Sequence, residues 1–165
     1  MSGGPSEAIG AVPWGRTFSH FGYVVDDLEA TAGRWSDTFG FEWAPVQRRE
    51  RSIRMEGAEQ SVDLAVTWSL EGPVRVELLE AVEGTVWERR HGHPIHHVCY
   101  WVPDLATEGA RLLALGWRVE VTEPGPDEVN GFAYLVDTDG FRVEPKPEDG
   151  KATIERWLAG GSLYD

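Results

Sequence analysis

Residues 20–28 read HFGYVVDDL, and residues 97–105, which lie 77 positions later, read HVCYWVPDL. The two stretches share five of nine residues (the histidine, the tyrosine, one valine, the aspartate and the leucine), whereas composition alone predicts fewer than about one identity. The repeat therefore indicates two copies of one structural unit. Because each copy opens a strand with a histidine, pairing of the copies would bring His20 and His97 close together.

The elements around the two histidine strands follow the same order. In the first half, apolar alternation and turn residues predict a strand over 18–25, a helix over 28–39 and strands over about 42–55, 62–69 and 74–82. The second half predicts a strand over 95–102, a helix over 105–115 and strands over about 117–122, 132–137 and 141–145. The predicted fold class is therefore α+β, with two tandem βαβββ modules that pair into a cup-shaped mixed sheet, followed by a short C-terminal helix.

The chain divides into three parts by composition and pattern. Residues 1–16 are rich in Gly, Pro and Ala and predict a flexible N-terminal arm. Residues 17–147 form the duplicated domain, with modules over 17–83 and 94–147. Residues 148–165 form a helical tail, in which Ile154, Trp157 and Leu158 recur at helical spacing and predict packing on the body or on a second subunit.

The net charge of −13 argues against some classes of partner. Nucleic acid and anionic membranes require a cationic face, so neither is expected as a partner. The sequence contains no apolar run of membrane-spanning length and no secretory signal, and its single cysteine, Cys99, has no partner for an intramolecular disulfide. These features predict a cytoplasmic protein. The one basic cluster, Arg48, Arg49, Arg51 and Arg54, is open to two interpretations, an attractor for an anionic part of a substrate or a set of solvated strand residues.

Two carboxylates occur in the middle of apolar strands, Glu77 in VRVELL (74–79) and Glu144 in FRVE (141–144). Burial of an unpaired carboxylate costs on the order of several kcal/mol, so each needs a cation, a hydrogen-bond partner or solvent. Together with His20 and His97 they occupy matching positions in the two halves. Two neutral imidazoles and two carboxylates supply both the donor atoms and the charge that one divalent metal ion requires.

These segments, together with DGFRVE at 139–144, resemble the vicinal oxygen chelate superfamily, which includes glyoxalase I, methylmalonyl-CoA epimerase, extradiol dioxygenases and bleomycin-resistance proteins. The likeness covers residues 17–147 and is greatest to the epimerase and glyoxalase I branch, although the epimerase has a glutamine where Glu77 stands. The resemblance implies that His20, Glu77, His97 and Glu144 bind one divalent ion (Zn, Ni, Co, Mn or Fe). It selects His97 over the adjacent His96, which strand alternation would direct outward.

The resemblance also implies a function. We expect a metal-dependent isomerase, epimerase or lyase that acts on a small carbonyl substrate through a metal-stabilised enolate, in a protein that forms a homodimer. A nearby carboxylate would remove the proton, and the candidates are Glu144 and Asp63, which resembles the epimerase base in position. Two other functions stay open on the sequence, namely a metal-free protein that sequesters its ligand, as bleomycin-resistance proteins do, and an oxygen-dependent ring-cleaving dioxygenase.

Eight tryptophans are an unusual number for 165 residues. Trp43, Trp68, Trp87 and Trp101 lie in or near predicted strands, so some of them could line the cup and select an aromatic or apolar substrate. We therefore expect a pocket that is partly aromatic.

Overall fold

The computed structural model describes residues 17–90 and 92–163. The arm expected over residues 1–16 lies outside the described residues. None of the helices in the described part of the chain is long and apolar enough to cross a membrane.

The two halves have the same order of elements, as the repeat predicts. The first half contains β1 (Phe18–Val25), α1 (Leu28–Phe39), β2 (Gln47–Met55), β3 (Ala58–Trp68) and β4 (Arg75–Glu80). The second half contains β5 (His97–Val102), α2 (Leu105–Ala114), β6 (Arg118–Thr122), β7 (Ala133–Val136) and β8 (Arg142–Pro147). A 3-10 turn over Glu148–Gly150 then leads into α3 (Lys151–Leu158). The α+β fold class with a short C-terminal helix is confirmed.

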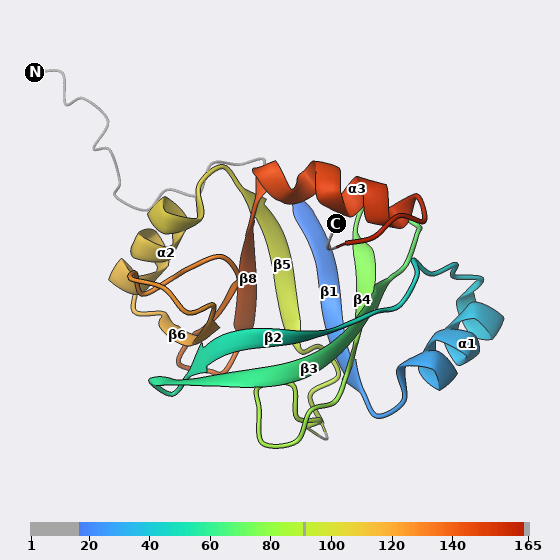
Figure 1. Cartoon of the computed structure of the whole chain (residues 1–165), viewed down its shortest axis with the longest axis horizontal. Helices are drawn as coiled ribbons and strands as arrows, with labels where there is room; N and C mark the ends of the chain where they lie inside the picture. Colours follow the sequence, from blue (N-terminus) through green and yellow to red (C-terminus); the bar gives the residue numbers. More distant parts are fainter. Residues whose placement is uncertain (1–16, 91, 164–165) are drawn as a thin grey trace, which may run out of the picture.

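The eight strands close into a barrel in the order β1-β4-β3-β2-β6-β7-β8-β5. In Figure 1, α1 and α2 lie at opposite sides of the strands, and α3 runs across one end of them. Within each half, the first strand pairs in parallel with the last, β1 with β4 and β5 with β8. The halves join through two antiparallel pairs, β1 with β5 and β2 with β6. The cup expected from the sequence therefore closes within one chain.

The central pair, β1 and β5, relates the halves symmetrically. Gly22 of β1 lies opposite His97 of β5, and Cys99, which holds the place of Gly22 in the repeat, lies opposite His20. The same two small residues adjoin the last strands, since Gly22 is in register with Glu77 and Cys99 with Glu144. The register thus carries both histidines and both glutamates to the middle of the sheet.

Helices α1 and α2 each begin directly after the repeated aspartate. The side chain of Asp27 accepts a hydrogen bond from Ala30 N at 2.8 Å, and the side chain of Asp104 accepts one from Thr107 N at 2.7 Å. An aspartate before the first helical turn satisfies an amide that has no partner within the helix, which explains why both helices begin at the following leucine.

Strand alternation separates an inner face of the barrel from an outer face. On β3, the buried Val62, Leu64, Val66 and Trp68 belong to the largest apolar cluster, which also includes Ile154 and Trp157 of α3. Ala65, one step out of phase, packs instead with Leu28 at the start of α1. The exposed Asp63 has the same parity as Ala65, so it lies on the outer face.

The hairpin between β2 and β3 is longer than predicted. Strand β3 begins at Ala58, four residues before the expected start at 62. Residues 58–61 are exposed, and all but Ala58 are polar, so they lack the apolar alternation from which a strand is predicted. Glu56 and Gly57 have positive φ angles of 53° and 79°, and this pair forms the tight turn that joins the two strands.

Candidate metal centre

Four buried side chains from four strands meet inside the barrel. They are His20 of β1, Glu77 of β4, His97 of β5 and Glu144 of β8, and each offers a nitrogen or oxygen atom within 4.8 Å of the other three. All four residues are at least nine-tenths buried. The structure thus brings together the complete set that the sequence singled out.

The separations between these atoms are those of donors around one metal ion. The two Nε2 atoms are 3.0 Å apart. His20 Nε2 lies 3.4 Å from Glu77 Oε2 and 3.3 Å from Glu144 Oε2, and His97 Nε2 lies 3.2 Å and 3.3 Å from the same oxygens. Bonds of about 2.0–2.2 Å from a central ion place neighbouring donors about 2.9–3.5 Å apart.

One atom of this cluster lacks a partner. Glu77 Oε2 is buried and makes no hydrogen bond to any described residue. The other oxygen, Oε1, accepts a hydrogen bond from Trp68 Nε1 at 2.7 Å, so the carboxylate is held with Oε2 directed at the two imidazoles. A buried oxygen without a partner is costly, and a cation at the centre of the cluster would satisfy it.

Glu144 is held in a corresponding way. Its Oε1 accepts a hydrogen bond from Lys146 Nζ at 3.0 Å, while Oε2 lies beside His20 and His97. In each glutamate, therefore, an N–H donor occupies one oxygen and the other oxygen faces the centre. Lys146 was missed by the sequence analysis, although its position two residues after Glu144 places it on the same face of β8.

The ionisation of the two glutamates favours metal binding, whereas His20 would have to lose a proton to an incoming metal ion. Burial opposes charge on both glutamates, yet His20 lowers the pKa of Glu77, and Lys146 followed by His20 lowers the pKa of Glu144. Burial likewise disfavours the charged form of His20, but the two carboxylates outweigh it and raise its pKa. Both glutamates are consequently carboxylates at neutral pH, the form that coordinates a cation.

A cavity of about 410 Å³ reaches the two glutamates. Aromatic side chains form part of its wall. The wall also contains the cationic side chains of Arg49, Arg51 and Lys146 and the carboxylates of Glu77, Glu123 and Glu144. The aromatic residues are Trp68, Phe132, Tyr134 and Trp157. The expected partly aromatic pocket is present, but of the four tryptophans named from the sequence only Trp68 lines it. Trp43 instead packs beside α1. Trp157 of α3 also lines the pocket, a position that the sequence did not predict.

Asp63 does not reach the cluster. It is exposed on the outer face of β3 and borders a separate depression with Arg48 and Glu80. The family resemblance led us to expect Asp63 near the centre, but strand parity directs Leu64 inward and Asp63 outward. The expectation that Asp63 acts as the base therefore has no support from its position.

His96 also differs from expectation. It precedes β5, and its ring is directed not into solvent but against His97, with the two Nδ1 atoms 2.9 Å apart. Its Nε2 lies 2.7 Å from the carbonyl oxygen of Val86. Burial lowers the pKa of His96 well below its usual value, with the nearby His97 and Arg142 acting in the same direction, so the ring is neutral.

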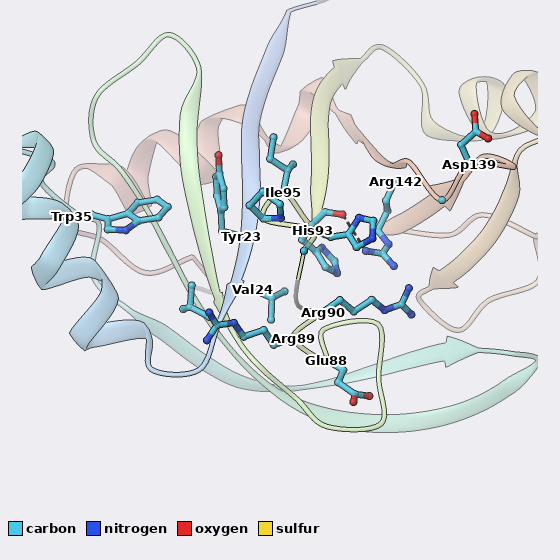
Figure 2. Close-up of a pocket in the computed structure, with 15 residues that line it drawn as sticks. Tyr23, Val24, Trp35, Glu88, Arg89, Arg90, His93, Ile95, Asp139 and Arg142 are labelled. Atoms are coloured by element: carbon cyan, nitrogen blue, oxygen red, sulfur yellow. Dashed lines mark hydrogen bonds between the residues drawn. The ribbon is translucent and has the colours of Figure 1, made fainter.

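A second, larger cavity of about 630 Å³ lies beside the segment that joins the two halves. Figure 2 shows Trp35 and Tyr23 on one side of it and Arg142 and Arg90 on the other. None of the four cluster residues lines this cavity, so we assign the chemistry to the smaller one.

The sequence and the fold were compared with those of known proteins. Residues 19–134 match the sequence family described as the Glyoxalase/Bleomycin resistance protein/Dioxygenase superfamily. Among curated proteins, none gives a significant match.

Solved structures share the fold at low sequence identity. A methylmalonyl-CoA epimerase in complex with methylmalonyl-CoA and NH4+ is 20% identical, with a TM-score of 0.57 over 80% of this chain and 94% of that chain. The methylmalonyl-CoA epimerase from Mycobacterium tuberculosis is 18% identical, with a TM-score of 0.55 over 79% of this chain and 87% of that chain. A mutant of 4-hydroxymandelate synthase from Streptomyces coelicolor is also 18% identical, with a TM-score of 0.55 over 80% of this chain and 38% of that chain. At these identities the likeness establishes the fold alone.

Proposed function

The chain belongs to the Glyoxalase/Bleomycin resistance protein/Dioxygenase superfamily, and from this premise we propose that it is a metal-dependent isomerase, epimerase or lyase that acts on a small carbonyl substrate through an enolate. The observation that carries the proposal is Glu77 Oε2, a buried carboxylate oxygen without a hydrogen bond that faces two imidazoles and a second carboxylate. That arrangement is costly unless a cation completes it.

His20, Glu77, His97 and Glu144 would hold one divalent ion, such as Zn, Ni, Co, Mn or Fe. When bound, the ion would act as a Lewis acid toward a carbonyl oxygen of the substrate. Two carboxylates balance the charge of such an ion, and Lys146 then leaves the site with one net positive charge. A positive, largely buried site favours a reaction in which negative charge develops on the substrate.

We assign proton removal to Glu144. It lines the cavity, and the contact with Lys146 holds its carboxylate in a defined orientation. Its lowered pKa keeps it ionised at neutral pH, and to accept a proton its Oε2 would have to leave the metal site and lose the partners that lower that pKa. Glu77 lines the same cavity from the other half of the barrel, but we assign it to metal binding alone, because Trp68 holds its Oε1 and its Oε2 faces the metal centre.

The walls of the cavity suggest the substrate. Trp68, Phe132 and Trp157 favour a flat or apolar portion next to the reacting carbonyl. In the same wall, the charge of Arg51 is balanced by Glu123 and that of Lys146 by Glu144. Two solved methylmalonyl-CoA epimerases with this fold are complexes with acyl-CoA compounds, so methylmalonyl-CoA is the first substrate to test.

The first test is metal content. Protein purified without chelator should contain close to one equivalent of a divalent ion, measured by inductively coupled plasma mass spectrometry. A content below about one tenth of an equivalent would sink the enzyme proposal and favour a metal-free sequestering protein.

The second test is proton exchange. In D2O, wild-type protein should introduce deuterium at the carbonyl-adjacent carbon of methylmalonyl-CoA, and Glu144→Gln should slow this at least about 100-fold. Asp63→Asn is the matched control, because it removes a carboxylate from the outer face of the barrel and should leave the rate unchanged. An equal loss in both variants would contradict the assignment of Glu144.

A further inference from the structure

Each cluster histidine is preceded by a residue that contacts its Nδ1 atom. Ser19 Oγ lies 3.2 Å from His20 Nδ1, and His96 Nδ1 lies 2.9 Å from His97 Nδ1. Ser19 and His96 hold the same place in the two repeats, and Ser19 is buried like the histidine that follows it. The contact is therefore a feature of both halves and not of one irregular loop.

We propose that His96 is a positioning residue that fixes His97 in the tautomer whose Nε2 lone pair faces the metal centre. This inference rests on the metal centre of the proposed function, and it is independent of the substrate and of the reaction.

The direction of the hydrogen bonds follows from one acceptor. The carbonyl oxygen of Val86 can only accept, so His96 Nε2, at 2.7 Å, must carry the proton. In a neutral imidazole the other nitrogen is then an acceptor, so His97 Nδ1 must donate to His96 Nδ1. His97 Nε2 is consequently without a proton and presents its lone pair to His20, Glu77 and Glu144.

The surroundings hold His96 in this orientation. Its backbone N–H donates to the carbonyl oxygen of Gly22 at 2.7 Å, and its own carbonyl oxygen accepts from the Arg142 guanidinium at 3.1 Å. The ring of Tyr134 packs edge-on against His96 and also lies 4.7 Å from the ring of His97. The same aromatic residue therefore restrains both imidazoles.

His96 is already committed at both ring nitrogens, which separates its role from that of a metal ligand. One nitrogen meets Val86 and the other meets His97. It also lines the cavity of Figure 2, where His93, from the same segment, is exposed. A hydrogen bond to the second nitrogen of a metal-binding histidine sets its tautomer and ring orientation, and loss of such a partner typically weakens metal binding about 10–100-fold.

Two conservative variants separate this role from simple packing. In His96→Gln, the side-chain amide falls near the former Nε2 position, so the contact with Val86 can persist while the acceptor for His97 is lost. In His96→Asn, the amide falls near the former Nδ1 position and its oxygen can still accept from His97. His93→Gln is the matched control, a histidine of the same cavity replaced in the same way.

Two measurements are needed on the full-length protein, Zn2+ affinity by competition with a chromogenic chelator and the His97 tautomer by 15N NMR of the metal-free protein. We expect wild-type His97 to carry its proton on Nδ1. His96→Gln should bind Zn2+ about 10–100-fold more weakly and lose the single tautomer, whereas His96→Asn and His93→Gln should stay close to wild type.

Equal affinities for the Gln and Asn variants would overturn the proposal, as would a wild-type His97 that carries no proton on Nδ1. If wild-type protein binds no divalent ion, the proposed function fails, but the tautomer in the metal-free protein still decides the role of His96. A variant that does not fold is recognised by its NMR spectrum, and the remaining variant is then compared with His93→Gln.

Discussion

Gly22 allows the two halves of the barrel to share one centre. A Cβ atom at this position would lie 2.1 Å from Cε1 and 2.4 Å from Nδ1 of His97, closer than atoms can approach. His97 therefore occupies the space that a side chain on β1 would fill. Cys99, the equivalent residue of the second half, is small and fully buried beside His20.

We predict that Gly22→Ala displaces the ring of His97. Because β1 and β5 are paired at this point and cannot separate freely, the variant should lose about 1–3 kcal/mol of unfolding free energy and bind Zn2+ at least about tenfold more weakly. Urea denaturation and chelator competition measure the two effects. Gly33→Ala is the control, because nothing lies within 4 Å of its added Cβ, and equal behaviour of the two variants would contradict the prediction.

The sequence predicted the position of some residues of the candidate metal centre and misplaced others. The sequence identified the four cluster residues, His20, Glu77, His97 and Glu144. The duplication marks equivalent positions in the two halves, and a carboxylate in an apolar strand needs a partner because burial of an unpaired charge is costly. Asp63 was placed at the centre by resemblance, and His96 was directed into solvent by strand alternation. His96 precedes the first residue of β5, where alternation does not apply, so only the folded loop determines what its ring contacts.

At the scale of single elements, the β2–β3 hairpin contains a local conflict. Glu56 adopts a φ of 53°, a conformation that is costly for a residue with a side chain and is accepted best by Gly, Asn and Asp. The flanking strands nevertheless pair without interruption from Gln47 with Val66 to Met55 with Ala58. Strand pairing therefore outweighs the cost of the turn.

We predict that Glu56→Asn stabilises the protein by up to about 1 kcal/mol, because asparagine followed by glycine is the preferred pair in this turn. The free energy of unfolding in urea measures the change. Gln60→Asn, which introduces the same residue at an exposed position within β3, should give no gain. A comparable gain in both variants would mean that the turn is not its source.

A second prediction concerns the start of α2. Hydrogen bonds from the Thr107 side chain and from Thr107 N lower the pKa of Asp104. The cap therefore contributes stability above the unfolded-state pKa of an aspartate, and this stability is lost as the pH falls through the lowered pKa. Asp104→Ala should lower the midpoint of urea denaturation at pH 7, and Asp104→Asn should restore most of it. The difference between wild type and Asp104→Ala should shrink in acid; an undiminished difference there would exclude the charged cap as its cause.

Elements were more predictable than their exact limits. The strand over 18–25 and the helix over 28–39 have the predicted bounds, because apolar periodicity and the Asp27 and Gly40 caps mark both ends of the helix. The start of β3 was not predictable, since its first residues are exposed on both faces and carry no pattern.

At the scale of the whole molecule, the cluster is the place where the two halves depend on each other. Each half supplies one histidine and one glutamate, and a bound ion would link β1 and β4 of the first half to β5 and β8 of the second. Metal binding should consequently stabilise the entire barrel.

We predict that Zn2+ at about 100 times its dissociation constant raises Tm by about 5–10 °C relative to chelator-treated protein. Differential scanning calorimetry measures the shift. His20→Ala should abolish it and Asp63→Asn should retain it. A shift of the same size in His20→Ala would show that Zn2+ binds elsewhere.

The homodimer expected from the family resemblance stays a prediction. Large apolar side chains that are about half exposed, Phe18, Phe141 and Ile95, are available for a contact between subunits. Sedimentation velocity at micromolar concentration should give twice the monomer mass of 18.4 kDa. A single species of monomer mass would refute the expectation.

The duplicated module, the order of its elements, the fold class and the four candidate metal-binding residues all followed from the amino-acid sequence. They could be predicted because repeats, capping residues and apolar periodicity are local properties of the chain. The tertiary structure decided the remaining features. These are the closure of the barrel within one chain, the outward position of Asp63, the place of Trp157 in the cavity wall and the contacts of His96 and Lys146. These depend on the register between strands distant in sequence, and a shift of one residue in that register exchanges the inner and outer faces.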